Sequence, residues 1–361
     1  MKLKIISALV FLSFITSCST NSEGSTSNYG GPLAPSNLIG EVISSTQINL
    51  SWTDNSTNET GFIIERKTSI GNYENIISLT QNITTYHDTG LLPGTSYTYR
   101  IKSFNNVGDS QLYSNEITLE TPTMYMPLTI GNYWNYDVQQ VNPGAVNTSI
   151  GIDHLFISND TIINNVSYKK MKTSAVPNGF FSNTLRNNGL KIIGSSIFVT
   201  GSFNLPFPGL SNPIQIDLNN FTYFNENASL NSEICSTSGT LHQTVTANNT
   251  TYPLDIDYTL KSVAQETLPT YLSNSVTYSN VKKTRLILNL RITTTSSGIT
   301  ATLLADQPVL TMNEYFAKNI GNVYTNTYFH YDINSSIATQ FSVPASISQT
   351  EEEFLTTYQV N

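Results

Sequence analysis

The sequence has few cysteines, few charged residues and no long apolar segment. Only 2 of its 361 residues are cysteine, so at most one disulfide could form. Charged residues make up 12 %, and 25 acidic residues against 17 basic ones leave a net charge of −8. We therefore expect no nucleic-acid partner, because phosphates demand a basic surface. The longest apolar stretch, residues 5–15, is shorter than the roughly 20 residues that a transmembrane helix needs.

Uncharged polar and aromatic residues are abundant instead. The chain contains 41 Asn, 20 Tyr and 16 Phe, and hydrophobic residues reach 39 %, which is enough for a packed core. Asn favours turns, while Thr and Tyr favour strands over helices. Sustained 3.6-residue periodicity is nearly absent. The composition predicts a mainly β protein.

The N-terminus has the features of an export signal. Lys2 and Lys4 precede the apolar stretch, which ends at Thr16, Ser17 and Cys18. Small residues before a cysteine resemble the signal of a bacterial lipoprotein. The resemblance implies that residues 1–17 are removed and that Cys18 is lipidated. The alternative is an ordinary secretory signal with an incidental cysteine.

Residues 18–33 are predicted to form a flexible tether, because they are rich in Ser, Thr, Asn and Gly. Ser19 beside the lipidated cysteine resembles lipoproteins that are sent to an outer membrane. We therefore expect a lipid-anchored protein of the cell envelope, on either the periplasmic or the outer side. The second cysteine, Cys235, is interpreted as a partly buried strand residue rather than a reactive thiol, because no neighbouring His activates it.

Residues 34–121 alternate between apolar and polar side chains in short segments, as in an antiparallel sandwich. Ile48, Leu50 and Trp52 form one such inward row. The segment 91–97 (Leu-Leu-Pro-Gly-Thr-Ser-Tyr) contains the Leu-x-Pro-x-Thr-x-Tyr pattern of a tyrosine corner. With this motif, the region resembles a fibronectin type III domain, which implies that the Tyr97 hydroxyl bonds to the chain upstream.

Residues 124–361 predict a second and larger antiparallel β domain, either a curved half-barrel or a barrel. Alternating apolar residues recur within 252–260 and 286–292, and further alternation in 354–360 predicts a last strand. Residues 127–136 and 315–323 resemble stretches of uncharacterised bacterial envelope lipoproteins. That resemblance implies a β-rich domain outside the cytoplasm and no particular reaction.

No catalytic or metal-binding motif is present. The sequence has no Gly-x-Ser-x-Gly elbow, P-loop or Cys-x-x-Cys pattern, and its four histidines are widely separated (His87, His154, His242 and His330). Asp255 and Asp257 are interpreted as the solvated side of a strand. The acidic run 351–353 is likewise expected to be solvated, leading into the final strand. We predict no catalytic residue, no metal site and no cofactor.

Three functions stay open on the sequence alone. The first is a non-catalytic, lipid-anchored envelope protein in which a fibronectin-like module spaces or presents a β-rich binding domain to a protein or glycan partner. In the second, the C-terminal domain carries a glycan or a hydrophobic ligand, because aromatics stack on sugars and line apolar clefts. The third is an extracytoplasmic glycan hydrolase.

Overall fold

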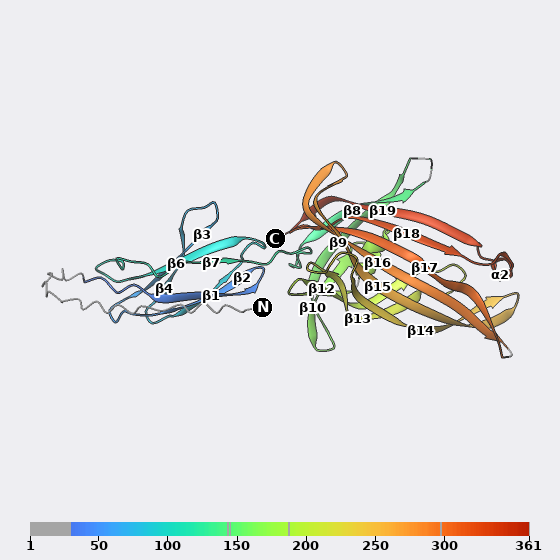
Figure 1. Ribbon diagram of the computed structural model, residues 1–361, viewed down its shortest axis with the longest axis horizontal. Coiled ribbons are helices and arrows are strands. Elements are labelled where there is room, and N and C mark those ends of the chain that lie inside the picture. Colours follow the sequence, from blue (N-terminus) through green and yellow to red (C-terminus); the bar gives the residue numbers. More distant parts are fainter. Residues whose placement is uncertain (1–29, 143, 145, 187, 297, 361) are drawn as a thin grey trace, which may run out of the picture.

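The computed structural model describes residues 30–142, 144, 146–186, 188–296 and 298–360. The chain is mainly β, with a small sandwich followed by a larger barrel-shaped sheet (Figure 1). The predicted signal peptide, Cys18 and most of the predicted tether lie outside the described residues. Within the described part of the chain, no helix combines the length and the apolar character needed to cross a membrane.

The small sandwich contains two antiparallel sheets. One has the strand order β1-β2-β5 and the other β4-β3-β6-β7. The strand bounds are β1 Ser36–Ser44, β2 Gln47–Thr53, β3 Gly61–Thr68, β4 Glu74–Thr80, β5 Thr85–Thr89, β6 Ser96–Phe104 and β7 Ile117–Glu120.

The inward rows of the sandwich match the alternation of the sequence. Ile48, Leu50 and Trp52 are buried on β2. The Trp52 ring meets Phe62 of the facing sheet edge to face, with 5.8 Å between the ring centres. The Tyr97 hydroxyl accepts a hydrogen bond from the backbone N–H of Leu92 at 2.9 Å. The predicted tyrosine corner is therefore confirmed.

The second part is one 12-stranded antiparallel sheet with two short helices. Its strand order is β13-β12-β11-β10-β9-β8-β19-β18-β17-β16-β15-β14. The bounds are β8 Tyr133–Val141, β9 Thr148–Ile163, β10 Val166–Thr173, α1 Phe180–Leu185, β11 Gly189–Ile193, β12 Ser196–Leu205, β13 Ile214–Asn225, β14 Glu233–Ala247, β15 Thr250–Ser273, β16 Val276–Ser296, β17 Ile299–Ala317, β18 Gly321–Asp332, α2 Ser335–Phe341 and β19 Ser346–Gln359.

The sheet curls until its two end strands, β13 and β14, lie side by side. Side-chain hydrogen bonds, rather than a backbone ladder, join the two ends of the sheet. Ser262 Oγ donates to the carbonyl oxygen of Thr222 at 2.6 Å, and Gln243 Nε2 donates to that of Pro213 at 3.3 Å. The domain is a nearly closed barrel. Of the two predicted forms, a curved half-barrel or a barrel, the structure has the second.

Asparagine pairs form several of the hairpin turns. Asn164 and Asn165 connect β9 to β10, and Asn248 and Asn249 connect β14 to β15, all with φ between 48° and 62°. Two-residue hairpins favour the type I′ turn, which needs positive φ at both positions, and Asn tolerates this better than most residues. These turns account for part of the high Asn content.

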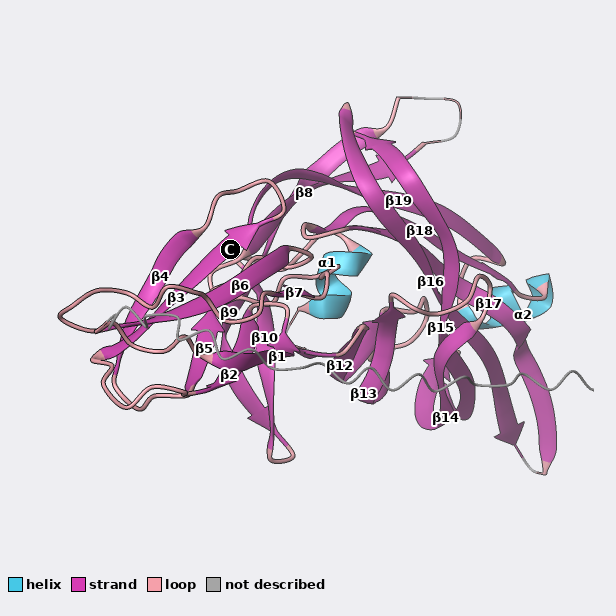
Figure 2. Ribbon diagram, turned by 60° about the vertical axis from the view of Figure 1, so that its left-hand side comes forward, coloured by secondary structure: helices cyan, strands magenta, loops and turns pink. Residues whose placement is uncertain are grey.

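The helix α1 lies inside the ring of strands (Figure 2). Its Phe181 packs against Tyr136 of β8 and Phe316 of β17, with ring centres 5.6 and 6.4 Å apart. Aromatic side chains therefore pack around α1 inside the barrel. The helix α2 lies at the end of the barrel farthest from the sandwich (Figure 1).

Candidate functional site

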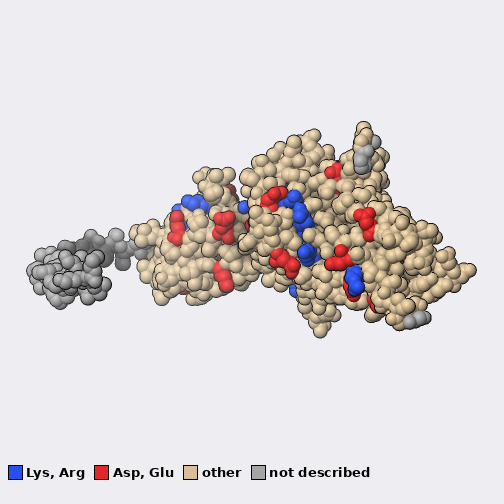
Figure 3. All heavy atoms as spheres, turned by 45° about the vertical axis from the view of Figure 1, so that its right-hand side comes forward, with Lys and Arg blue, Asp and Glu red and all other residues tan. Residues whose placement is uncertain are grey.

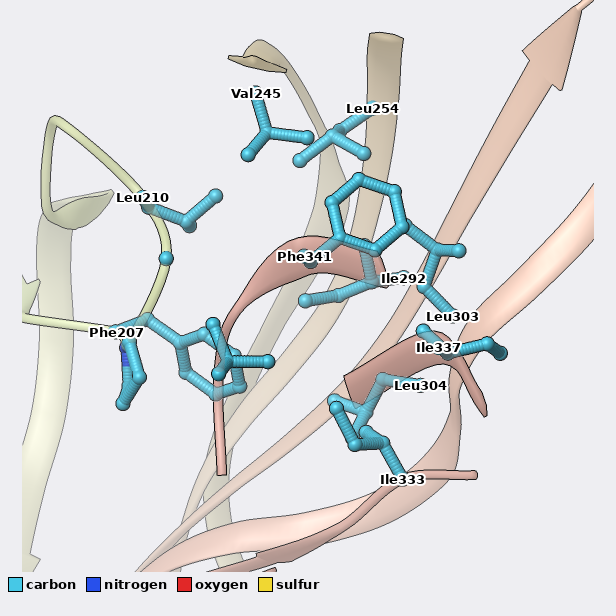
Figure 4. Close-up of a pocket in the computed structure, with 13 residues that line it drawn as sticks. Phe207, Leu210, Val245, Leu254, Ile292, Leu303, Leu304, Ile333, Ile337 and Phe341 are labelled. Atoms are coloured by element: carbon cyan, nitrogen blue, oxygen red, sulfur yellow. The ribbon is translucent and has the colours of Figure 1, made fainter. Parts of the chain in front are cut away.

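An apolar pocket lies at the far end of the barrel, beneath α2. Its cavity volume is about 60 Å³, below the roughly 300–1,000 Å³ typical of pockets that enclose a whole ligand, and it is partly open to solvent. Four neighbouring strands supply its walls, the segment 333–343 its roof, and the β12–β13 loop one side (Figure 4). The wall side chains are Val245, Leu254, Ile292, Leu303 and Leu304.

The roof is a short helix held at both ends. At its start, the side chain of Asn334 accepts a hydrogen bond from the N–H of Ser336 at 2.9 Å. Ser342 ends it in the left-handed conformation. Phe341 rests edge to face on Tyr252 of β15, with 5.3 Å between the ring centres. These contacts position Ile337 and Phe341 over the pocket (Figure 4).

Three carboxylates hold the N-terminal end of α1 inside the barrel. The backbone N–H groups of residues 178–182 donate to Asp153, Glu351 and Glu353 over distances of 2.6–3.2 Å. Glu353 also accepts a bond from the Ser182 hydroxyl at 2.7 Å. Burial raises the pKa of Glu353 to about 8 and that of Glu351 to about 7, while these hydrogen bonds act in the opposite direction.

The expectation that the acidic run 351–353 is solvated is therefore wrong. Glu353 is only 1 % exposed and Glu351 is partly buried, because both point into the barrel. Only Glu352 faces outward, where it accepts a bond from the Tyr324 hydroxyl at 2.5 Å. The inward carboxylates are used by the backbone of α1 and do not converge on an open cleft.

A further glutamate, Glu314 on β17, is fully buried in the barrel. The Tyr223 hydroxyl donates to one of its oxygens, and the other has no hydrogen-bonding partner among the described residues. Burial raises the pKa of Glu314 to about 8. Burial and the nearby carboxylate also hold the pKa of Tyr223 well above its usual range. The sequence analysis did not find this residue, since a single Glu among alternating apolar residues carries no motif.

The interpretations of Asp255, Asp257 and Cys235 agree with the structure. Asp255 and Asp257 are about half exposed and pair with His242 and Arg291, as expected for the solvated side of a strand. Cys235 is a partly buried residue of β14. Nowhere among the residues that the structure describes do three or more His, Cys, Asp or Glu side chains form a group that could hold a metal ion.

The stretches 127–136 and 315–323 meet in space. Trp134 Nε1 donates to the carbonyl oxygen of Ile320 at 2.6 Å, and the Tyr136 hydroxyl donates to that of Asn322 at 3.0 Å. Gly321 lies between them at φ +118°, and a Cβ there would come within 2.7 Å of the Trp134 ring nitrogen. These contacts show that Trp134, Tyr136 and Gly321 have a structural role in packing the two stretches together.

Aromatic residues on the outer face of the barrel stack on one another. Tyr271 lies flat on Tyr315 with 4.4 Å between ring centres, and Tyr324 lies between Tyr315 and Phe354 at 5.3 and 5.0 Å. A sugar ring needs a free aromatic face. Because part of each face is covered by its neighbour, this row favours packing over glycan binding.

Comparison with known proteins adds one finding to this geometry. The family description Fibronectin type III domain matches residues 33–120. These residues form a fibronectin type III domain. Two solved structures similar to it are the FN5 domain of Drosophila Lar (24 % identity, 25 % of this chain and 97 % of that chain, TM-score 0.22) and a Fn3-like protein from Clostridium thermocellum (28 % identity, 26 % and 96 %, TM-score 0.22). A search of curated proteins gave no match.

The fibronectin type III domain meets the barrel through the tyrosine-corner loop. Asn319, in the β17–β18 turn, donates from its side chain to the carbonyl oxygen of Pro93 at 3.2 Å and accepts from the N–H of Met124 at 3.2 Å. Thr123 donates to Glu226 at 2.8 Å. The segment between the domains is therefore hydrogen-bonded to both of them. On the barrel side its partners are Asn319 and Glu226, and on the sandwich side the carbonyl oxygen of Pro122 accepts from the N–H of Gly94.

The sequence analysis missed the pocket residues, although one signal was present. Ile333, Ile337 and Phe341 recur at four-residue intervals, the spacing of one helix face. This short pattern lies in a chain otherwise dominated by two-residue alternation. It indicates a single amphipathic turn that must cover an apolar surface elsewhere in the fold.

Proposed function

We propose that this protein binds a hydrophobic ligand in the pocket beneath α2 and does not catalyse a reaction. The observation that carries the proposal is the lining of the pocket, which consists entirely of apolar side chains and glycine. Transfer of apolar surface from water into such a site contributes about 25 cal/mol per Å². A binding role needs no acid, base or nucleophile in the pocket, and none lines it.

The lining favours a hydrophobic ligand over a glycan. Sugars are recognised by aromatic faces together with several convergent polar groups, and the pocket offers no polar side chain. Its two aromatic residues, Phe207 and Phe341, lie among aliphatic ones (Figure 4).

The fibronectin type III domain acts in this proposal as the spacer between an anchored N-terminus and the barrel. Gly30, the first described residue, accepts bonds from Asn58 and Asn105, at the end of that domain opposite to Pro93, which contacts the barrel. An anchor at Cys18 would then lie on the side of the molecule away from the pocket. The pocket would face away from the membrane.

The binding role is tested with N-phenylnaphthylamine, a dye whose fluorescence rises in apolar surroundings. We expect saturable binding to the full-length protein. Ile337→Asp, on the partly exposed underside of α2, should weaken it at least about tenfold, because a carboxylate then borders an apolar site. The matched control Ile299→Asp lies at an exposed hairpin and outside the pocket, and should leave binding unchanged.

A second variant fills the pocket without adding charge. Leu303→Trp enlarges a side chain that is already partly exposed in the lining, and it should also weaken dye binding by about tenfold or more. Non-saturable fluorescence, or equal binding by all three variants, would show that the dye binds elsewhere and would remove the basis of the proposal.

The envelope location rests on Cys18 and is tested separately. Cys18→Ser removes the acylation site, so the protein should leave the detergent-extracted membrane fraction and lose palmitate labelling. Two or more acyl chains are needed for stable anchoring, at about 0.8 kcal/mol per buried methylene. If the natural protein is released from membranes by salt alone and takes up no palmitate, the lipid anchor does not exist.

A further inference from the structure

A second hollow adjoins the apolar pocket on the other side of the β12–β13 loop. Residues 207–210 of that loop line both hollows. From there the second hollow, which we call the groove, extends along loop residues 211–213 to Ile347 and Gln349 of β19. The pocket and the groove therefore border one another at this loop.

The pocket and the groove differ in polarity but not in charge. The pocket is lined only by apolar side chains and glycine, whereas the groove adds Ser211, Asn212 and Gln349. Neither lining contains a charged residue. The face drawn in Figure 3 likewise carries its charged side chains over the fibronectin type III domain and the middle of the barrel, and its far end is uncharged.

Charged residues of both signs lie next to pocket residues in the chain: Arg291 directly precedes Ile292 and pairs with Asp257. Asp306 follows Leu304 on β17, and Asp332 directly precedes Ile333. Asp332 is exposed and pairs with His330 at 3.0 Å. A charged group of either sign would therefore meet no charged partner in the two linings. A cation would gain little from an exposed carboxylate that already has a partner.

One buried hydroxyl beside the shared loop lacks a partner. Tyr331 is 1 % exposed, and its ring lies 5.1 Å from that of Phe207, which lines both hollows. Its hydroxyl has no hydrogen-bonding partner among the described residues. Tyr331 belongs to neither lining, so its hydroxyl is not one of the groups that a ligand in the pocket or the groove would contact.

We propose that the pocket and the groove together bind a single-chain amphiphile with an uncharged polar head. The end of the hydrocarbon chain occupies the pocket, and the rest of the chain and the head lie in the groove, the head among neutral hydroxyl and amide groups. This inference rests on the proposed function. It adds the class of ligand. A charged head is excluded from this class, because removing a charge from water without giving it a partner costs free energy.

The inference is tested by displacement of N-phenylnaphthylamine from the full-length protein. Three competitors carry the same lauroyl or dodecyl chain: monolaurin with a neutral head, laurate with an anionic head and dodecyltrimethylammonium with a cationic head. All are used below their micelle-forming concentrations. We expect monolaurin to bind at least about tenfold more tightly than either charged competitor.

The outcomes separate this inference from the proposed function. Saturable dye binding with charged competitors as tight as monolaurin would overturn the uncharged head and leave hydrophobic binding intact. Dye binding without displacement by any of the three would overturn the amphiphile. Absence of saturable dye binding would overturn both.

A variant in the groove tests where the head lies. Gln349 is exposed on β19, so Gln349→Leu should not disturb folding. It should weaken monolaurin about fivefold, the effect of one lost hydrogen bond of about 1 kcal/mol, and leave dye affinity unchanged. The control Gln359→Leu, also exposed and at the other end of β19, should change neither. Equal affinity of Gln349→Leu and the natural protein for monolaurin would place the head outside the groove.

Discussion

At the scale of single residues, strand β19 shows how one step of register changes the chemistry of a face. Alternation of Phe354, Thr356 and Tyr358 predicts a strand, and the strand is present. The neighbouring positions Glu353 and Leu355 are the buried ones. Because side chains alternate with a period of two, this choice of face puts a carboxylate inside the barrel.

The buried Glu314 predicts a pH dependence of stability. Its pKa is about 8 in the folded protein, against 4.5 for an ordinary glutamate. Between these values only the folded state holds the proton, so the stability that Glu314 contributes is greatest below pH 4.5 and is lost as the pH rises toward 8. Each carboxyl of this kind lowers the free energy of unfolding by about 1.4 kcal/mol per pH unit in that window.

Glu314→Gln should reduce this slope, because an amide of similar shape has no proton to lose. The check is chemical denaturation of the barrel at several pH values from 5 to 9. Glu351 and Glu353 contribute in the same direction, since their pKa values are also raised, so part of the slope should persist. If the variant lost stability with rising pH as steeply as the natural protein, Glu314 would be ionised over the whole range from pH 5 to 9.

The tyrosine corner gives a second residue-scale prediction. Tyr97→Phe removes the hydroxyl that accepts from Leu92 and keeps the ring, so we expect a loss of about 1 kcal/mol in stability. Tyr113→Phe is the matched control, because its hydroxyl bonds Glu65 at the surface. Hydrogen exchange of core amides on β3 and β6 measures the difference. Equal effects of the two substitutions would contradict the role of the corner.

At the scale of elements, α1 depends on groups outside itself. A helix of six residues is too short to be stable alone, and its N-cap residue, Gly179, makes no side-chain capping bond. Glu353 of β19 and its two neighbouring carboxylates supply the missing acceptors. The helix therefore exists because the barrel surrounds it.

Glu353→Ala should release α1. The substitution leaves two buried N–H groups and one hydroxyl without their acceptor, at about 1–3 kcal/mol for each unsatisfied group. We expect a clear drop in the thermal midpoint and faster amide exchange across 180–185. Glu233→Ala, at an exposed position on β14, serves as the control and should be near neutral. Unchanged exchange in α1 would show that Phe181 packing alone holds the helix.

At the scale of the whole molecule, the two domains have separate apolar cores. The cluster around Trp52 and Phe62 shares no residue with the cluster around Trp134 and Phe316. The hydrogen bonds at the joint connect polar groups, chiefly through Asn319. Each core can therefore form without the other.

Residues 32–122 expressed alone should fold and unfold cooperatively. The segment contains every strand of the sandwich and its complete core, and it loses the polar contacts of the joint and the two side-chain hydrogen bonds that Gly30 accepts. Dispersed amide resonances and a single thermal transition would meet the expectation. Amide signals confined to the range of a disordered chain would show that the barrel is needed to fold this domain.

The sequence by itself determined the mainly β class, the sandwich with its tyrosine corner, and the alternating strands of the barrel. These follow from patterns within ten or so residues, where backbone geometry decides which side chains share a face. The tertiary structure alone decided the ring closure, the pocket and the carboxylates on α1. Glu353 and Phe181 are 172 residues apart, and the pocket takes side chains from 207 to 343. Such contacts depend on how the sheet twists and closes, which no local pattern of apolar and polar residues specifies.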